Sequence, residues 1–103
     1  MNAIRHEVET TYINEWVDMG AYELVVNAKT AEEMRRQRVD LVDINYVLRT
    51  GSVVQSDMLD SRGLWDVLGG TIDGDLLDLQ IAVVSSECEV ELLRIIKLKR
   101  RRK

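Results

Sequence analysis

Residues 64–84, with the sequence LWDVLGGTIDGDLLDLQIAVV, decide the fold of this chain. On both sides of Asp73-Gly74 apolar residues alternate with polar ones, which is the pattern of strands that bury one face. An Asp-Gly pair between two such runs is typical of a tight hairpin turn. The stretch therefore predicts two antiparallel strands, with Gly69-Gly70 indicating either a β-bulge or a close approach of another backbone segment.

Two more strands extend this pattern outward, one at residues 52–56 and one at residues 90–98. Turns at residues 60–63 and 85–87 connect them to the central hairpin. The last segment also fits a helical stripe, but its β-branched residues and the preceding turn favour a strand. Strict alternation in that strand places Arg94 between Leu92 and Ile96 on its apolar face, and Ile95 on the opposite face.

Before residue 51 the apolar period lengthens to nearly four residues, which predicts helices. The first helix has Asn2 as its N-cap, stops at Gly20, and carries Tyr12 and Trp16 on one face. Residues 22–26 are apolar and short, so they form either a brief strand or an extended linker.

Two shorter helices follow, and each has a recognisable start. Thr30 and Glu33 match a capping box, in which each side chain bonds the backbone amide of the other residue. Asp40 caps the next helix, which ends at Gly51 in the left-handed conformation. We therefore expect an α+β fold, in which about three N-terminal helices pack on one face of a four-stranded antiparallel meander.

The bulk composition is that of an ordinary globular domain, with 103 residues, 46% of them hydrophobic and 31% charged. We expect one α+β domain at residues 1–98, made of the helix at 1–20 and a core at 22–98, with a basic tail at 99–103. A single cysteine cannot form an internal disulfide, which fits a reducing cytoplasm. The sequence has no leader, no apolar run of membrane-spanning length and too few His and Cys residues for a metal site, and it implies no cofactor.

The charge is divided unevenly along the chain. Residues 1–96 hold eight Lys and Arg against all eighteen Asp and Glu, a formal charge of −10, and the last seven residues restore the net charge to −4. Such a cationic tail can bind nucleic acid or another polyanion by neutralising phosphates. It can also dock on an acidic surface of a second copy or of a partner protein, or remain a solvated terminus. The nucleic-acid candidates are Lys97, Lys99, Arg100, Arg101, Arg102 and Lys103.

Residues 29–39 (KTAEEMRRQRV), the following helix with its end at residues 48–51 (LRTG), the strand at 64–69 and the Asp73-Gly74 hairpin together resemble a bacterial family, the domain-of-unknown-function 4258 family. The resemblance covers residues 22–98. It implies a fold similar to the RelE and BrnT toxins, which are small ribonuclease-like domains, and a role in binding or cleaving RNA. This chain has Thr30 where the family usually has a His, so the resemblance does not supply that side chain here.

Two arginines are weak catalytic candidates. On a sheet face, Arg94 can clamp the charged phosphate of an RNA-cleaving reaction. The alternative that we favour for Arg94 is a structural pair with a carboxylate at the sheet margin. Arg62 precedes Trp65 and can offer a cation and a ring to a nucleotide, although a solvated turn residue beside a core tryptophan is the simpler interpretation.

The leading hypothesis is a cytoplasmic bacterial RelE-like protein of the toxin type that binds RNA through its tail and the adjacent sheet edge. An enzymatic version would be ribonuclease-like, but the sequence offers no general acid–base pair for it. The alternative is a non-catalytic protein-interaction module, such as one that forms a homo-oligomer. The first helix supports that alternative, because Tyr12, Trp16 and Val17 must cover either the protein's own sheet or a partner. A membrane partner is not expected.

Overall fold

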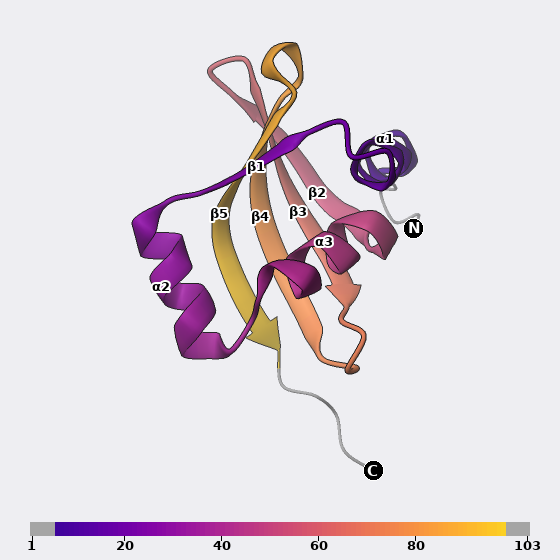
Figure 1. Ribbon diagram of the computed structural model, residues 1–103. Helices are drawn as coiled ribbons and strands as arrows, with labels where there is room; N and C mark the ends of the chain where they lie inside the picture. Colours follow the sequence, from indigo (N-terminus) through magenta and orange to yellow (C-terminus); the bar gives the residue numbers. More distant parts are fainter. Residues whose placement is uncertain (1–5, 99–103) are drawn as a thin grey trace.

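The computed structural model describes residues 6–98 and consists of three helices and a five-stranded sheet (Figure 1). The expected α+β class is confirmed. A single 3₁₀ turn, Ser85–Glu87, separates the last two strands. The elements in chain order are α1 (Glu7–Asp18), β1 (Glu23–Val26), α2 (Ala28–Gln37), α3 (Leu41–Thr50), β2 (Ser52–Leu59), β3 (Arg62–Gly70), β4 (Leu76–Val84) and β5 (Glu89–Leu98).

The sheet differs from the prediction in one strand. Strands β2 to β5 form the expected antiparallel meander, but β1 adds a fifth strand and the order is β1-β5-β4-β3-β2. β1 runs parallel to β5, with Glu23 opposite Glu89 and Val26 opposite Leu92. The prediction of four antiparallel strands was therefore wrong. A four-residue strand whose partner lies more than sixty positions later leaves no local pairing signal.

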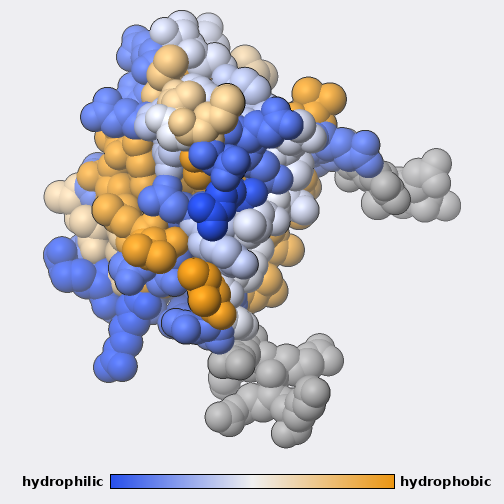
Figure 2. Space-filling model, turned by 45° about the vertical axis from the view of Figure 1, so that its right-hand side comes forward, coloured by the Kyte–Doolittle hydropathy of each residue, from blue (hydrophilic) through white to orange (hydrophobic). Residues whose placement is uncertain are grey.

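The three helices lie on one face of the sheet and build a single core (Figure 1). We call this face the inner face, and the opposite one the outer face. On the inner face of β4, Leu77, Leu79 and Ile81 have no solvent exposure. Each such side chain contributes roughly 1.5–3 kcal/mol through burial. The molecular surface seen in Figure 2 differs from this buried core, because its hydrophobic atoms form separate patches between hydrophilic ones.

The start of α3 follows the prediction, whereas the start of α2 does not. The Asp40 carboxylate accepts from the amide of Asp43 at 2.9 Å, and the Asp43 carboxylate accepts from the amide of Asp40 at 3.1 Å. The N-cap of α2 is Asn27, whose side chain accepts from the amide of Thr30 at 2.8 Å. Thr30 is thus a buried residue of the first turn, and the predicted capping box with Glu33 was wrong.

Two glycines allow α3 and β3 to approach closely. A Cβ on Gly51 would lie 2.7 Å from the Val47 carbonyl oxygen and 2.8 Å from that of Leu68, and a Cβ on Gly69 would lie 2.9 Å from the Cα of Gly51. The close backbone approach predicted at residues 69–70 is present, and the bulge lies elsewhere. Gly51 itself is extended, with φ at −81°, so the predicted left-handed end of α3 was wrong.

The register of β5 shifts by one residue in its middle. Ile81 pairs with Leu92 and Gln80 pairs with Arg94, which leaves Leu93 as the extra residue of a β-bulge. After the bulge every side chain faces the side opposite to the one that strict alternation predicts. Ile95 is therefore buried in the inner core, and Arg94 is exposed on the outer face, opposite to its predicted place on the buried apolar side.

The first helix covers its own domain. Trp16 is buried in the core, and Tyr12 lies between Trp16 and Trp65, with ring centroids 5.1 Å and 6.0 Å apart. Of the two surfaces that this helix face could cover, the protein's own sheet or a partner, the structure has the first. The predicted N-cap Asn2 lies outside the described residues. No helix within residues 6–98 is long and apolar enough to cross a membrane.

Candidate polyanion-binding site

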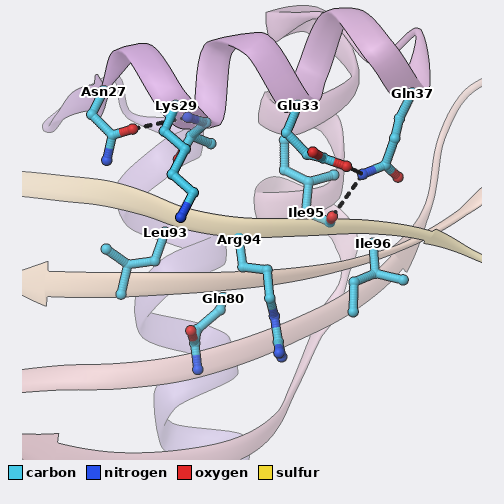
Figure 3. A pocket seen from close by; sticks show the side chains of 10 residues that line it. Asn27, Lys29, Glu33, Gln37, Gln80, Leu93, Arg94, Ile95 and Ile96 are labelled. Carbon is cyan, nitrogen blue, oxygen red and sulfur yellow. Dashed lines mark hydrogen bonds between the residues drawn. The ribbon is translucent and has the colours of Figure 1, made fainter.

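A hollow of about 670 Å³ lies between α2 and the lower half of β5 (Figure 3). It forms because β1 pairs only with residues 89–92 of β5, so that beyond Leu92 the neighbour of β5 is a helix and no longer a strand. Helix α2 contributes polar side chains and the sheet contributes both charge and apolar surface. Its wall includes Asn27, Lys29, Thr30, Glu33, Gln37, Leu93, Arg94 and Ile96.

Gln37 fixes the distance between α2 and β5 at one end of the hollow. Its side-chain nitrogen donates to the Ile95 carbonyl at 2.9 Å, and its side-chain oxygen accepts from the Lys97 amide at 2.7 Å. Both bonds join the helix to backbone groups of the strand (Figure 3 shows the first). The hollow therefore has a fixed wall, because its two sides cannot separate without losing both bonds.

Two cations line the hollow without a counter-ion. Within residues 6–98, neither Lys29 nor Arg94 has a carboxylate at ion-pair distance. Lys29 reaches from α2 across β5, and Arg94 extends from β5 on the outer side of the sheet (Figure 3). In a body with a formal charge of −10, these two cations on one hollow form a local positive site for an anion.

One carboxylate, that of Glu33, also lines the hollow. The Glu33 carboxylate accepts from Gln37 and Arg36, and these two hydrogen bonds hold the pKa of Glu33 below its ordinary value. That negative charge is therefore partnered on the helix itself. The hollow also opens beside the N-terminus of α2 at Asn27, where the helix dipole favours an anion.

The apolar part of the hollow comes from the bulge. Leu93 and Arg94 project on the same side of β5, as does Ile96, because the bulge places two consecutive residues on the outer side (Figure 3). Cations beside apolar side chains form the combination that contacts both the phosphate and the base of a single-stranded nucleic acid.

Asp78 lies beside Arg94 on the outer face. Burial raises the pKa of the Asp78 carboxyl, the nearby Asp66 raises it further, and Arg94 opposes both effects. The Asp78 Oδ1 atom has no solvent exposure and no hydrogen-bond partner in the described part of the chain. Arg94 thus has a carboxylate in its electrostatic environment, but that carboxylate is not its ion-pair partner.

The sequence-predicted residues do not all converge here. Arg62 forms an ion pair with Glu91 at 3.5 Å and is not among the residues that line the hollow. Arg62 therefore stands apart from the hollow, and its role as a nucleotide contact stays a prediction. Lys97 is held by the Asp75 carboxylate at 3.4 Å and by the Gln37 carbonyl at 3.3 Å. Lys99, Arg100, Arg101, Arg102 and Lys103 lie outside the described residues.

Sequence reasoning missed Lys29 as a site residue and misjudged Arg94. Lys29 was part of the family-like motif, but with the helix start placed at Thr30 it fell outside the helix. A signal was present, since Asn27 is as good an N-cap as threonine and puts Lys29 in the first turn. For Arg94, the bulge reverses the face that strict alternation predicts, and within residues 6–98 no carboxylate lies at ion-pair distance from its guanidinium.

Thr30 stands in the wall of the hollow and is 5% exposed. It is the position at which the resemblance implies a His, so a family site, if shared, would be at this place. Among residues 6–98 no three His, Cys, Asp or Glu side chains gather in a way that could hold a metal ion. Comparisons with protein-family models, curated proteins and solved structures found no match. The resemblance to the 4258 family therefore stays a prediction.

Proposed function

We propose that this protein binds RNA at the hollow between α2 and β5, with Lys29 and Arg94 contacting phosphates and the tail at residues 99–103 adding further contacts. The observation that carries the proposal is a pair of cations in a hollow on the strand that leads directly into the tail. Neither cation has a carboxylate at ion-pair distance within residues 6–98. RNA is favoured among polyanions by the resemblance to ribonuclease-like domains and by the apolar side chains at Leu93 and Ile96.

The proposal is one of binding without cleavage. RNA hydrolysis needs a group that accepts a proton from the attacking hydroxyl, within hydrogen-bond reach of it. Thr30 at the family His position is not a base at neutral pH, and the Glu33 carboxylate is already bonded to Arg36 and Gln37. The side chains of the hollow can neutralise and position a phosphate, and they offer no proton acceptor free of other bonds.

The experiment is a salt titration of RNA affinity, measured by fluorescence anisotropy with a labelled single-stranded RNA. We expect the logarithm of the affinity to fall linearly with the logarithm of salt concentration, by about 0.7 per phosphate contact for a single strand. The double variant Lys29→Ala with Arg94→Ala should reduce that slope by roughly 1.4, and deletion of residues 99–103 should reduce it more.

Arg35→Ala is the matched control, since Arg35 is a cation of the same helix that does not line the hollow and is paired with Glu32. It should leave the slope nearly unchanged. An affinity that is indifferent to salt, or that falls as much with Arg35→Ala as with the Lys29 and Arg94 changes, would contradict the proposal. Growth inhibition on expression, or cleavage of the RNA, would overturn its non-catalytic part.

A further inference from the structure

The outer face of the sheet is uncovered by the helices, all of which lie on the other side (Figure 1). Cross-strand neighbours on this face form two adjacent rows, one with Leu68, Asp78 and Ile96 and the next with Leu76 and Leu98. We call the four apolar members of these rows the outer patch. Leu76, Ile96 and Leu98 are 38%, 37% and 36% exposed, so they form a contiguous apolar surface and not isolated residues.

A carboxylate stands in the centre of the outer patch. Asp78 has Leu68 and Ile96 on its two sides in the register. This explains why burial raises its pKa and why its Oδ1 atom has no partner among the described residues. Arg94 lies on the neighbouring strand, one row away, because it is opposite Gln80 while Asp78 is opposite Ile96. The face therefore carries, side by side, a partly buried carboxylate and a guanidinium, and neither has an ion-pair partner in the described part of the chain.

We propose that the outer face binds the outer face of a second copy of this chain. A two-fold axis that lies in the interface and passes between Arg94 and Asp78 places each Arg94 over the Asp78 of the other copy. The same axis buries the two outer patches against each other. In such an isologous contact, each Asp78 gains an Arg94 as its partner and each Arg94 gains an Asp78. A second copy fits this face because the face itself carries both members of the charge pair.

The size of the face fits a stable dimer. Four antiparallel strands about 4.8 Å apart, with roughly nine residues each at about 3.3 Å, cover about 570 Å² as a flat area. Side-chain relief increases the accessible area, so two such faces approach the roughly 1,200–2,000 Å² that specific interfaces bury. Sheets packed in this way lie about 10 Å apart, which side chains of leucine and arginine length can fill.

Sedimentation velocity of the full chain from low to high micromolar concentration tests the proposal. We expect a concentration-dependent dimer, and we expect Leu76→Glu with Leu98→Glu to weaken it at least tenfold. Both positions are partly exposed, so the variant should retain its circular dichroism spectrum. Val42→Glu, which changes an exposed apolar residue of α3 in the helix layer, is the matched control and should leave the dimer unchanged.

Exchanging the charges of Asp78 and Arg94 tests whether a second copy of the chain binds the outer face. Asp78→Arg and Arg94→Asp should each weaken the dimer, because each places like charges over one another, and the double variant should restore it. A different protein as the true occupant would leave the chain monomeric at all concentrations, and that result overturns the proposal. Failure of the double variant to restore a dimer that the single variants weaken would also overturn it.

This dimer does not rest on RNA binding, and the two can fail separately. Leu76→Glu with Leu98→Glu should dissociate the dimer and free Arg94 from the Asp78 of the other copy. In this monomeric background, Lys29→Ala with Arg94→Ala should still reduce the salt slope of RNA affinity by roughly 1.4. The dimer should also persist at salt concentrations that abolish RNA binding, because most of its contacts are apolar.

Discussion

The two faces of the sheet contain similar amounts of leucine, isoleucine and valine but differ in what covers them. On the inner face, Leu77, Leu79 and Ile81 have no exposure because α1, α2 and α3 lie over them. On the outer face, Leu76 and Ile96 remain more than one-third exposed and surround the Asp78 carboxylate. The difference shows that apolar content alone does not define the core, and that one face is held by the fold while the other is available for binding.

Truncating one leucine on each face tests the difference between the two faces with the largest expected effect. Leu79→Ala should lower the free energy of unfolding by about 2–5 kcal/mol, because a fully buried leucine leaves a cavity under the helices. Leu76→Ala, three residues earlier, should change it by less than about 1 kcal/mol at protein concentrations where the chain is monomeric. Urea unfolding of both variants measures the two values. Equal losses would mean that the outer face is also part of the core.

Neighbouring glycines allow a second comparison. Gly69→Ala should cost about 1–3 kcal/mol, since the new Cβ would lie 2.9 Å from the Gly51 Cα and 3.2 Å from the Val47 side chain. Gly70→Ala should stay within about 0.5 kcal/mol, because its Cβ would meet only the Asp75 carbonyl oxygen, at 3.6 Å. Thermal unfolding of the pair measures the difference. A similar shift for both would show that α3 does not lie as close to β3 as described.

At the edge between the faces, Gln37→Ala removes two hydrogen bonds to β5. Each is worth about 0.5–1.5 kcal/mol, so the variant should lose roughly 1–3 kcal/mol in total, and less if water replaces the amide. Faster hydrogen exchange of the Lys97 amide would locate the loss. Gln55→Ala, on exposed β2, is the matched control and should have little effect. Unchanged exchange at Lys97 would contradict the role of Gln37.

The smallest expected effect is that of pH on Asp78. Its raised pKa means that the ionised carboxyl is less favourable in the folded chain than in the unfolded one. Stability is therefore lost as pH rises from below the ordinary value of 3.8 through the raised value, and Asp78→Asn should be more stable than the unmodified chain at neutral pH. That gain should vanish below the ordinary pKa. The difference in urea midpoint between the two chains, followed against pH, checks the sign, since other carboxylates affect both chains alike.

The sequence predicts what depends on neighbouring residues. The Asp73-Gly74 turn and the Asp40 cap are local, and the structure has both, with Gly74 at a φ of 93°. The parallel pairing of β1 with β5 depends on residues far apart, so the sequence at residues 22–26 fits a strand and a linker equally. The bulge is hidden for a different reason, because Leu92 and Leu93 are both apolar and either can take the inward position.

The candidate site was less predictable than the fold. A one-residue shift in β5 exchanges Arg94 and Ile95 between the faces, so the place of a single charged side chain depended on a bulge with no sequence signal. The error at the start of α2 came from two competing caps, Asn27 and Thr30, only three residues apart. Packing decided between them, because Thr30 is buried in the described structure and a cap residue normally faces solvent.

Gln37 also affects whether another chain can add a strand at the edge of β5. A side-chain amide carries the same donor and acceptor as a peptide unit, so Gln37 occupies the place of one residue of a sixth strand beside Ile95 and Lys97. The lower half of β5 is thereby closed as a template on which another chain could add a strand. Strand addition at an open sheet edge is a route to fibres, and Gln37 blocks it over this part of the edge.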